Sequence, residues 1–367
     1  MKKYLVFTIF LGLVFIPYMA LAKVSGPCAN CHTMHNSQDG QLVDNTGPNP
    51  VLLTNDCVGC HSSDTSSTHY DLGGCEVPVV LYTGGEPTSY LAGGNFWWVK
   101  EEFGNNDTKG HNVFEGQGDD YLTEAPGSVV TCGTDACHQN LNNPANVGSG
   151  QVLVNGKYGC EGCHLQVKHH ASDHQNGVSG LVGASGGWYR FLSGHSSGLG
   201  SGVEGYEHGL WEAGQPNLAI GIANNHNEYL GVVGNHSQKA DFVQLGNTMT
   251  AFCCGCHGTF HIQEDDGWVR HPSDAVIIQD PGNPGEYGDA GGAGHLYDPL
   301  SPVSKPTVDE TPDTIINPDV DMVMCLSCHR PHGSPYPDML RWDYTTQQAG
   351  GGGDDKGCFY CHTTKND

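Results

Sequence analysis

The segment Cys-Ala-Asn-Cys-His at residues 28–32 is the first copy of a pattern that recurs along the whole chain. In each copy two residues separate a pair of cysteines, and a histidine follows the second cysteine at once. The chain holds six copies, at residues 28–32, 57–61, 160–164, 253–257, 325–329 and 358–362. Because the 367 residues include only 21 histidines, chance does not place one after every pair. One shared chemical role must explain all six copies.

The pattern C-x-x-C-H predicts covalent attachment of c-type haem. Two thiols bond to the porphyrin edge, and the histidine binds the iron from one side. A looser copy, Cys132-Gly-Thr-Asp-Ala-Cys137-His138, has four residues between its thiols. We interpret it as a seventh haem site, with a local disulfide as the alternative. The predicted attachment residues are Cys28, Cys31, Cys57, Cys60, Cys132, Cys137, Cys160, Cys163, Cys253, Cys256, Cys325, Cys328, Cys358 and Cys361, and the proximal ligands are His32, His61, His138, His164, His257, His329 and His362.

Two other classes of protein use paired cysteines. Zinc ribbons need no histidine after each pair and would leave most of these histidines without a role. Thioredoxin-like redox motifs occur singly on a βαβ pattern, which this sequence does not have. Neither class fits the repeated pattern.

Residues that normally build a protein core are scarce. Leu, Ile, Val and Phe supply 63 of the 345 residues after residue 22, a fraction typical of disordered chains when net charge is high. The 53 glycines and 20 prolines disfavour long helices and a large sheet. Because the haems must supply the missing core, we expect a mostly irregular fold with few short helices and minimal β-structure. The 40 acidic against 15 basic residues exclude a nucleic-acid binder.

The first residues resemble an export signal. A basic start at Lys2 and Lys3 precedes an apolar run over 4–16 and an Ala-Leu-Ala cleavage site at 20–22. We therefore expect a signal peptide over 1–22 and one heptahaem domain over 23–367, with a long insert rich in Gly, Ser, Asn and His over 165–252. The apolar run is too short for a good membrane anchor, and no later segment approaches spanning length.

Fourteen histidines remain for the opposite face of each iron, and few methionines compete with them, so we expect histidine on both faces and low potentials. Spacing restricts the choice. His35 lies three residues beyond His32 and cannot reach the far face of its own haem, so it must serve another iron. His332, His261 and the pair His169 and His170 follow their motifs in the same way. Adjacent residues of an extended chain point to opposite sides, so His169 and His170 could serve two haems.

The histidines that we favour as distal ligands are His35, His111, His169, His170, His261, His271 and His332, followed in second rank by His69, His195 and His295. For each, the alternative is a surface or propionate-binding imidazole. That alternative is the favoured one for His174, His208, His226 and His236, which lie in the loop-rich insert.

Two cysteines fall outside the haem pattern. An exported protein allows a disulfide between Cys75 and Cys254, and two unrelated free thiols are the other interpretation. For local structure, we expect short helices just after each C-x-x-C-H motif and a short strand over 77–82.

Several segments resemble one family. Residues 26–37 (Gly-Pro-Cys-Ala-Asn-Cys-His-Thr-Met-His-Asn-Ser), 93–100, 109–112, 270–272 and 325–332 (Cys-Leu-Ser-Cys-His-Arg-Pro-His) are similar to those of the OmcS-type outer-surface cytochromes, within the wider group of doubled-CxxCH cytochromes. The likeness covers 24–126 and 249–362 and is weak between them, because those proteins carry six haems whereas this chain has an extra site and a long insert around 132–250. It implies histidine on both faces of every iron and a continuous chain of stacked haems. It also implies a head-to-tail homopolymer in which His35 ligates the haem on Cys325, Cys328 and His329 of the neighbouring subunit.

Three functions remain open at this point. We expect extracellular electron transfer by a filament subunit, secreted to the cell surface, with other cytochromes or extracellular electron acceptors as partners. A monomeric periplasmic or surface electron carrier is the first alternative. A multihaem oxyanion reductase is the second, although it would need an iron with an open position, often marked by a departure such as C-x-x-C-K that this sequence does not contain.

Overall fold

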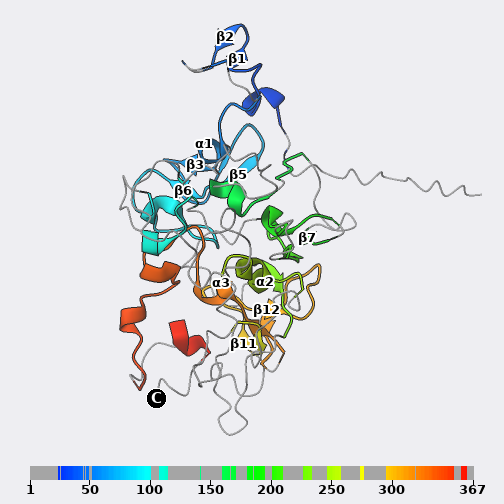
Figure 1. The fold of residues 1–367 in the computed structure, drawn as a ribbon, viewed down its shortest axis with the longest axis vertical. Helices are drawn as coiled ribbons and strands as arrows, with labels where there is room; N and C mark the ends of the chain where they lie inside the picture. Colours follow the sequence, from blue (N-terminus) through cyan, green and yellow to red (C-terminus); the bar gives the residue numbers. More distant parts are fainter. Residues whose placement is uncertain are drawn as a thin grey trace, which may run out of the picture.

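A computed structural model gives the architecture of the chain (Figure 1). It describes residues 24, 26–43, 45, 47–48, 52–100, 107–114, 141, 159–165, 167–170, 180–184, 186–194, 201–209, 226–233, 246–257, 273–276, 295–318, 320–350 and 357–361. The predicted sites at 132–138 and His362 lie outside these ranges.

The short helices of the fold include one at each C-x-x-C-H motif, and each of these contains the first cysteine of its pair. They are the α-helices α1 (Cys57–Cys60), α2 (Met249–Cys254) and α3 (Cys325–Cys328) and the 3₁₀ helices η1 (Cys28–Asn30), η7 (Gly159–Gly162) and η14 (Gly357–Tyr360). The prediction of helices just after each motif was therefore wrong, since the helical turns start at or before the first cysteine of each motif. The reason is that the histidine N–H closes a turn on the carbonyl of the first cysteine, as from His61 to Cys57 (2.8 Å) and His329 to Cys325 (3.0 Å).

The remaining 3₁₀ turns are equally short: η2 (Phe96–Trp98), η4 (Asp107–Lys109), η9 (Tyr189–Phe191), η12 (Pro337–Met339) and η13 (Tyr344–Thr346). No helix among the described residues is long and apolar enough to cross a membrane.

The largest sheet has six very short strands, in the order β10-β14-β12-β9-β8-β7. Its strands are β7 (Leu181–Val182), β8 (Gly205–Tyr206), β9 (Glu228–Leu230), β10 (Ala275–Val276), β12 (Ser304–Lys305) and β14 (Met322–Val323). Half of them, β7, β8 and β9, come from the region 165–252. This glycine-rich region is therefore hydrogen-bonded to the C-terminal part of the chain through the sheet. Between β9 and β12 the pairing is parallel, with Ser304 opposite Tyr229.

Four two-stranded pairs complete the β-structure: β1 (Ser37–Gln38) with β2 (Gln41–Leu42), β3 (Ser62–Ser63) with β6 (Leu81–Tyr82), β4 (His69–Asp71) with β5 (Glu76–Pro78), and β11 (His295–Leu296) with β13 (Ile315–Ile316). The strand expected over 77–82 is split, because β5 and β6 pair with different partners. The expectation of few short helices and minimal β-structure is confirmed.

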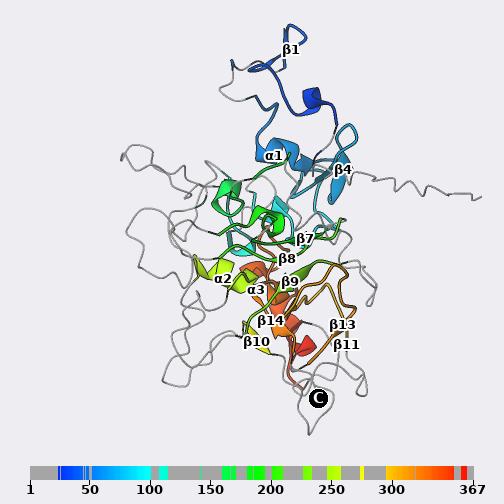
Figure 2. The ribbon, with the colours of Figure 1, turned by 90° about the vertical axis from the view of Figure 1, so that its right-hand side faces the viewer.

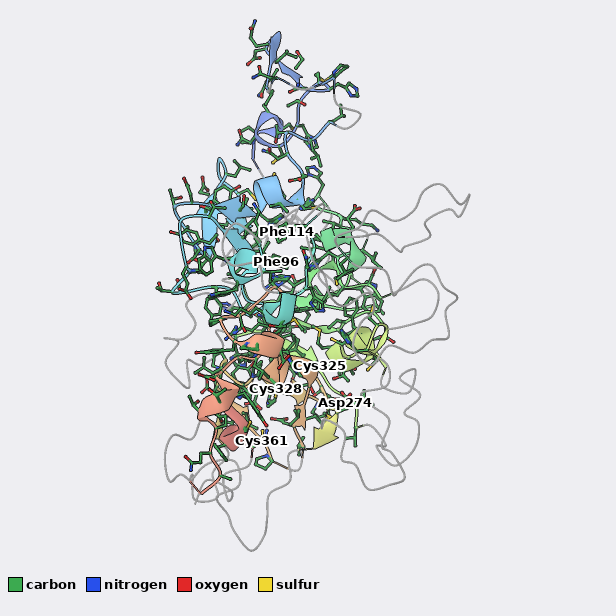
Figure 3. The ribbon with its side chains drawn as sticks, turned by 60° about the vertical axis from the view of Figure 1, so that its left-hand side comes forward. Phe96, Phe114, Asp274, Cys325, Cys328 and Cys361 are labelled. Atoms are coloured by element: carbon green, nitrogen blue, oxygen red, sulfur yellow. The ribbon has the colours of Figure 1, made fainter. Side chains whose placement is uncertain are left out.

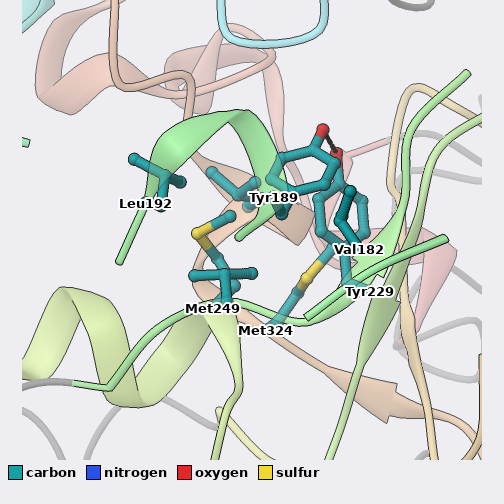
Figure 4. Close-up of a cluster of buried hydrophobic side chains, with 8 residues drawn as sticks. Val182, Tyr189, Leu192, Tyr229, Met249 and Met324 are labelled. Carbon is teal, nitrogen blue, oxygen red and sulfur yellow. Dashed lines mark hydrogen bonds between the residues drawn. The ribbon is translucent and has the colours of Figure 1, made fainter. Parts of the chain in front are cut away.

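Among the residues that the structure describes, apolar side chains form three small clusters in place of one core. The first gathers Val182, Tyr189, Leu192, Val203, Tyr229, Met249, Met324 and Leu326 (Figure 4). Cys163 and Cys253 pack against this cluster. The second holds Tyr297, Val303, Ile316 and Val323, with Cys361 against it. The third joins Leu81, Phe96, Val99 and Phe114 beside Val58 of α1. Each cluster thus lies against at least one C-x-x-C-H motif, where a porphyrin would extend it.

The molecule is elongated, with its two ends formed by different parts of the chain. The hairpin β1–β2 protrudes at one end, and the C-terminal segment lies at the other (Figures 1 and 2). The short helices of the cysteine motifs lie between these ends.

Candidate functional site

The imidazoles of the site are held by main-chain carbonyls. The Nδ1–H of His61 donates to the Pro78 carbonyl (2.9 Å), that of His164 to Arg190 (2.7 Å), and that of His329 to Asp338 (2.7 Å). His111, which belongs to no cysteine motif, donates in the same way to Pro331 (2.9 Å). An Nδ1–H engaged with a carbonyl fixes the ring and leaves the Nε2 lone pair available, as in metal-binding histidines.

Burial favours the neutral form of His61, His111, His164 and His332. It lowers the pKa of His61 and His164, and it lowers the pKa of His111 to about 4 with help from the neighbouring His257. The pKa of His332 falls to about 3 because of burial and the nearby His164. Only a neutral imidazole can bind a metal ion through nitrogen, so this environment suits ligation.

Four motif histidines each face a second histidine from elsewhere in the chain. The ring centroids are 5.8 Å apart for His32 and His170, 6.3 Å for His61 and His169, 5.9 Å for His164 and His332, and 6.1 Å for His257 and His111.

The spacing in these pairs fits a shared metal ion. The Nε2 atoms of His32 and His170 are 3.5 Å apart. Two metal–imidazole bonds of about 2 Å each, in line, would span about 4 Å. The donor set therefore fits an iron held from both faces, with the paired thiols on the adjacent helical turn fitting a porphyrin edge.

The partner histidines lie where they cannot serve their own motif. His169 and His170 follow the same motif, yet they face rings of two different motifs, His61 and His32. His332 lies three residues beyond His329 and faces His164 instead.

His332 is positioned by a glycine and an aromatic ring. The backbone N–H of His332 donates to the Gly93 carbonyl (2.8 Å), and the centroid of its imidazole ring lies 4.8 Å from that of the Phe96 ring. A Cβ atom at Gly93 would lie only 3.0 Å from the His332 Nδ1 atom, so a side chain there would displace the ring.

The motifs follow one another in space in their sequence order. Burial and the nearby Cys31 thiol raise the pKa of Cys60, and a hydrogen bond with Cys160 lowers the pKa of Cys57 to about 7. Further along, Cys163 and Cys253 pack against the same apolar cluster.

The last three motifs, at 253–257, 325–329 and 358–362, continue this order toward the C-terminal end of the molecule. A hydrogen bond with Cys325 raises the pKa of Cys253, and α2 contacts α3. Cys328 lies close to Cys361 and Cys358, whose charges add to the effect of burial on its pKa. Figure 3 shows Cys325, Cys328 and Cys361 in succession, with Phe96 and Phe114 on the other side. The six C-x-x-C-H motifs thus form one continuous row.

The structure places the other histidines that the sequence singled out as follows. His35 is exposed beside the β1–β2 hairpin, and its backbone has a φ of 55°. His69 lies on β4 with its Nε2 4.0 Å from the Glu76 carboxylate. For His295 the structure gives only its backbone position on β11. His138, His195, His261, His271 and His362 lie outside the described residues, as do Cys132 and Cys137.

The structure also places the surplus cysteines and two histidines of the insert. Cys75 and Cys254 are both free thiols. Cys75 is partly exposed beside β5, whereas Cys254 is buried near Asp274 and Cys325, so the two belong to different parts of the fold. His226 is not a surface residue: only 2% of it is exposed, and its ring stacks on Tyr297 at 3.7 Å. His208 is half-buried.

The carbonyl acceptors were not identified from the sequence. Pro78, Pro331, Arg190 and Asp338 are spread along the chain, and their backbone groups carry no signature in residue type. Pro331 is a partial exception because it sits inside the Arg-Pro-His segment that ends in His332.

Comparisons with known proteins agree with this chemistry. Residues 318–367 match a family described as the doubled CXXCH motif. The chain is 26% identical over 368 residues to the C-type cytochrome OmcS of Geobacter sulfurreducens, covering 86% of this chain and 78% of that protein. Two solved structures are also similar over 89% of this chain and 86% of theirs. They are the outer membrane cytochrome S filament (TM-score 0.48, 22% identity) and the OmcS nanowires (TM-score 0.43, 18% identity), both of the same bacterium.

Proposed function

We propose, from the homology to the C-type cytochrome OmcS, that this chain is an extracellular electron-transfer protein with seven covalently attached c-type haems. The observation that carries the proposal is the row of motifs in which four motif histidines each face a second imidazole. Each haem supplies one iron that takes up and releases a single electron. The chain's own residues attach, orient and enclose these groups.

The proposed ligand pairs follow the facing rings. One iron is bound by His32 and His170, a second by His61 and His169, a third by His164 and His332, and a fourth by His257 and His111. For the sites at 132–138 and 358–362, the distal ligands come from the set His261, His271, His69, His195 and His295.

Ligation from both faces favours electron transfer over catalysis. An oxyanion reductase needs a coordination position that substrate can enter, and two imidazoles on one iron leave none. The ring of Phe96 also packs against the His332 ring, with the centroids 4.8 Å apart. We therefore assign an electron-transfer role and not an enzymatic one.

The chain is proposed to polymerise head to tail. His35 is exposed at the protruding end of the molecule, and His329 is already oriented by its hydrogen bond to Asp338 (Figure 1). In the proposed joint, His35 of one subunit binds the haem on Cys325 and Cys328 of the next. A contact donated in one direction is heterologous and grows into an open filament unless it closes as a ring.

The titles of the similar solved structures, a filament and nanowires, support this assembly. We accordingly place the protein outside the cell, where other cytochromes or extracellular acceptors would exchange electrons with it.

Spectroscopy and intact mass test the proposal together. The secreted protein should carry seven haems, show only low-spin iron, and bind no carbon monoxide when reduced. A high-spin fraction that turns over a small oxyanion would favour the reductase, and a monodisperse monomer under all conditions would favour a soluble carrier.

A further inference from the structure

The carbonyl that anchors His164 belongs to a residue with an unusual backbone conformation. Arg190, in the turn η9, has a φ of 46° and a ψ of 35°, and Phe191 follows with a φ of 63°. Both residues lie in the left-handed region, which residues other than glycine, asparagine and aspartate seldom adopt, because Cβ approaches the backbone carbonyl oxygen. Such a conformation persists only where the surrounding structure holds it in place.

The other carbonyls that anchor an imidazole need less support. Two of them belong to Pro78 and Pro331, and the ring of proline fixes φ at about −65°. A third belongs to Asp338, which has a φ of 58°, but aspartate is one of the few residue types that tolerate the left-handed region. Among these four described acceptors, Arg190 is the one whose residue type fits its conformation least.

Glu207 holds Arg190 on both sides of the bond that sets φ. Its Oε1 atom accepts from the Arg190 backbone N–H (2.5 Å), and its Oε2 atom lies 3.7 Å from Nη1 of the Arg190 guanidinium. The N–H and the side chain lie at opposite ends of the N–Cα bond, so a carboxylate that holds both restrains rotation about it. Glu207 is itself buried just after β8, and its backbone N–H donates to the Gly180 carbonyl (2.7 Å).

The guanidinium is also held by residues at the edge of the six-stranded sheet. Its Nη2 donates to the His208 carbonyl (3.0 Å) and to the Oδ1 atom of Asn227 (3.2 Å). The same Asn227 oxygen accepts from the backbone N–H of His208 (2.9 Å), and Asn227 is buried immediately before β9. The side chain of Arg190 is therefore fixed to the segments that flank two strands.

The turn held in this way touches imidazoles that we assign to two haems. The Arg190 carbonyl accepts from Nδ1 of His164 (2.7 Å), and the Phe191 ring lies 6.2 Å from the ring of His169, which faces His61. The left-handed conformation therefore occurs where the chain meets the ligands.

We propose that Arg190 and Glu207 are positioning residues: they hold the carbonyl that accepts the His164 hydrogen bond, and so lower the reduction potential of the haem on Cys160 and Cys163. The proposal rests on the proposed function, since it requires a haem at this motif. A hydrogen bond from Nδ1–H makes an imidazole a more basic ligand, and a more basic ligand stabilises ferric iron more than ferrous iron. Hydrogen bonding around the ligands is one of the means by which a protein sets the potential of a haem. Loss of this bond should make the haem easier to reduce.

Two substitutions of Arg190 separate position from charge. Arg190→Ala and Arg190→Gly remove the same charge and the same guanidinium contacts, but glycine adopts a positive φ without steric cost and alanine does not. A redox titration of the full haem-loaded protein, followed by electron paramagnetic resonance, reports each low-spin ferric haem as its signal disappears on reduction. The signal that is missing in His332→Ala identifies the haem on Cys160 and Cys163. In Arg190→Ala this haem should be reduced at least tenfold more readily than in Arg190→Gly, which is 59 mV for one electron.

A second pair of variants keeps the test valid if Arg190→Ala does not fold. Glu207→Gln and Glu207→Ala are both neutral at this position, but glutamine keeps an oxygen that can accept from the Arg190 backbone N–H. The haem should be reduced at least threefold more readily in Glu207→Ala than in Glu207→Gln. Its ferric signal should also lie closer to that of wild type in Glu207→Gln.

Two kinds of failure are distinguishable. If peptide mapping finds haem on Cys160 and Cys163 but the members of each pair agree within twofold, loss of charge explains any shift and the positioning role is wrong. A haem that is harder to reduce in the alanine variants would also contradict it. If mapping finds no haem at this motif, the proposed function itself fails there.

Discussion

Replacing His332 by Ala removes one imidazole from the pair that it forms with His164. The rings of the pair lie 5.9 Å apart, and the His332 ring packs at 4.8 Å from Phe96. His164 remains anchored through Nδ1 to the Arg190 carbonyl, so the haem on Cys160 and Cys163 should stay attached with one axial ligand. We expect one haem in seven to become high-spin and one carbon monoxide to bind per reduced chain.

The same substitution should lower stability. It replaces a large ring by a methyl group beside Phe96 and removes an iron–imidazole bond, and large-to-small changes of this kind cost about 3 kcal/mol or more. Visible spectra and carbon monoxide titration report the ligand, and thermal unfolding reports the packing. His226→Ala is the matched control, because it deletes a more deeply buried imidazole that stacks on Tyr297 and faces no motif histidine in the described structure. If His332→Ala keeps every iron low-spin and binds no carbon monoxide, the pairing with His164 is wrong.

Three further outcomes are expected. The intact mass should equal the chain from Lys23 plus seven haems, and a mass with six would mean that the motif ending in His138 is unused. His35→Ala should keep all haems but leave one per subunit high-spin and weaken polymerisation; normal filaments with only low-spin iron would disprove the intersubunit ligand. Asp274 has its folded pKa raised from 3.8 to about 8 by burial, so the folded state binds more protons and stability falls as pH rises from about 4 to 8. Asp274→Asn should flatten that fall in urea unfolding and be a few kcal/mol more stable than wild type at pH 9, whereas an unchanged slope would show that the carboxyl is solvated.

Local chemistry is what the sequence predicts well in this protein. Each C-x-x-C-H copy spans only five residues and predicts covalent haem attachment by itself, so the prediction does not depend on the rest of the fold. Spacing also limits the choice of partners, because a residue three positions after a proximal ligand is confined to the same side of its haem. The positions of His169, His170 and His332 beside rings of other motifs follow that geometry.

Long-range placement is what the sequence does not predict. His226 lies in a polar, glycine-rich stretch that suggested a surface loop, yet β9 enters the six-stranded sheet there and buries it. Cys75 and Cys254 were matched by elimination, and nothing local could show that they lie in different parts of the molecule. The contacts of Arg341 with Ala92 and Pro299 join residues 249 and 42 positions away, which residue type alone does not reveal.

Electron cryomicroscopy of the secreted protein tests the central proposal most directly. We expect filaments in which the haems of the six C-x-x-C-H motifs follow one another in sequence order, each iron held by two imidazoles. At each joint, His35 should bind the iron of the haem on Cys325 and Cys328 of the next subunit. Single subunits, or a row interrupted by an iron with an open face, would contradict an electron-conducting chain.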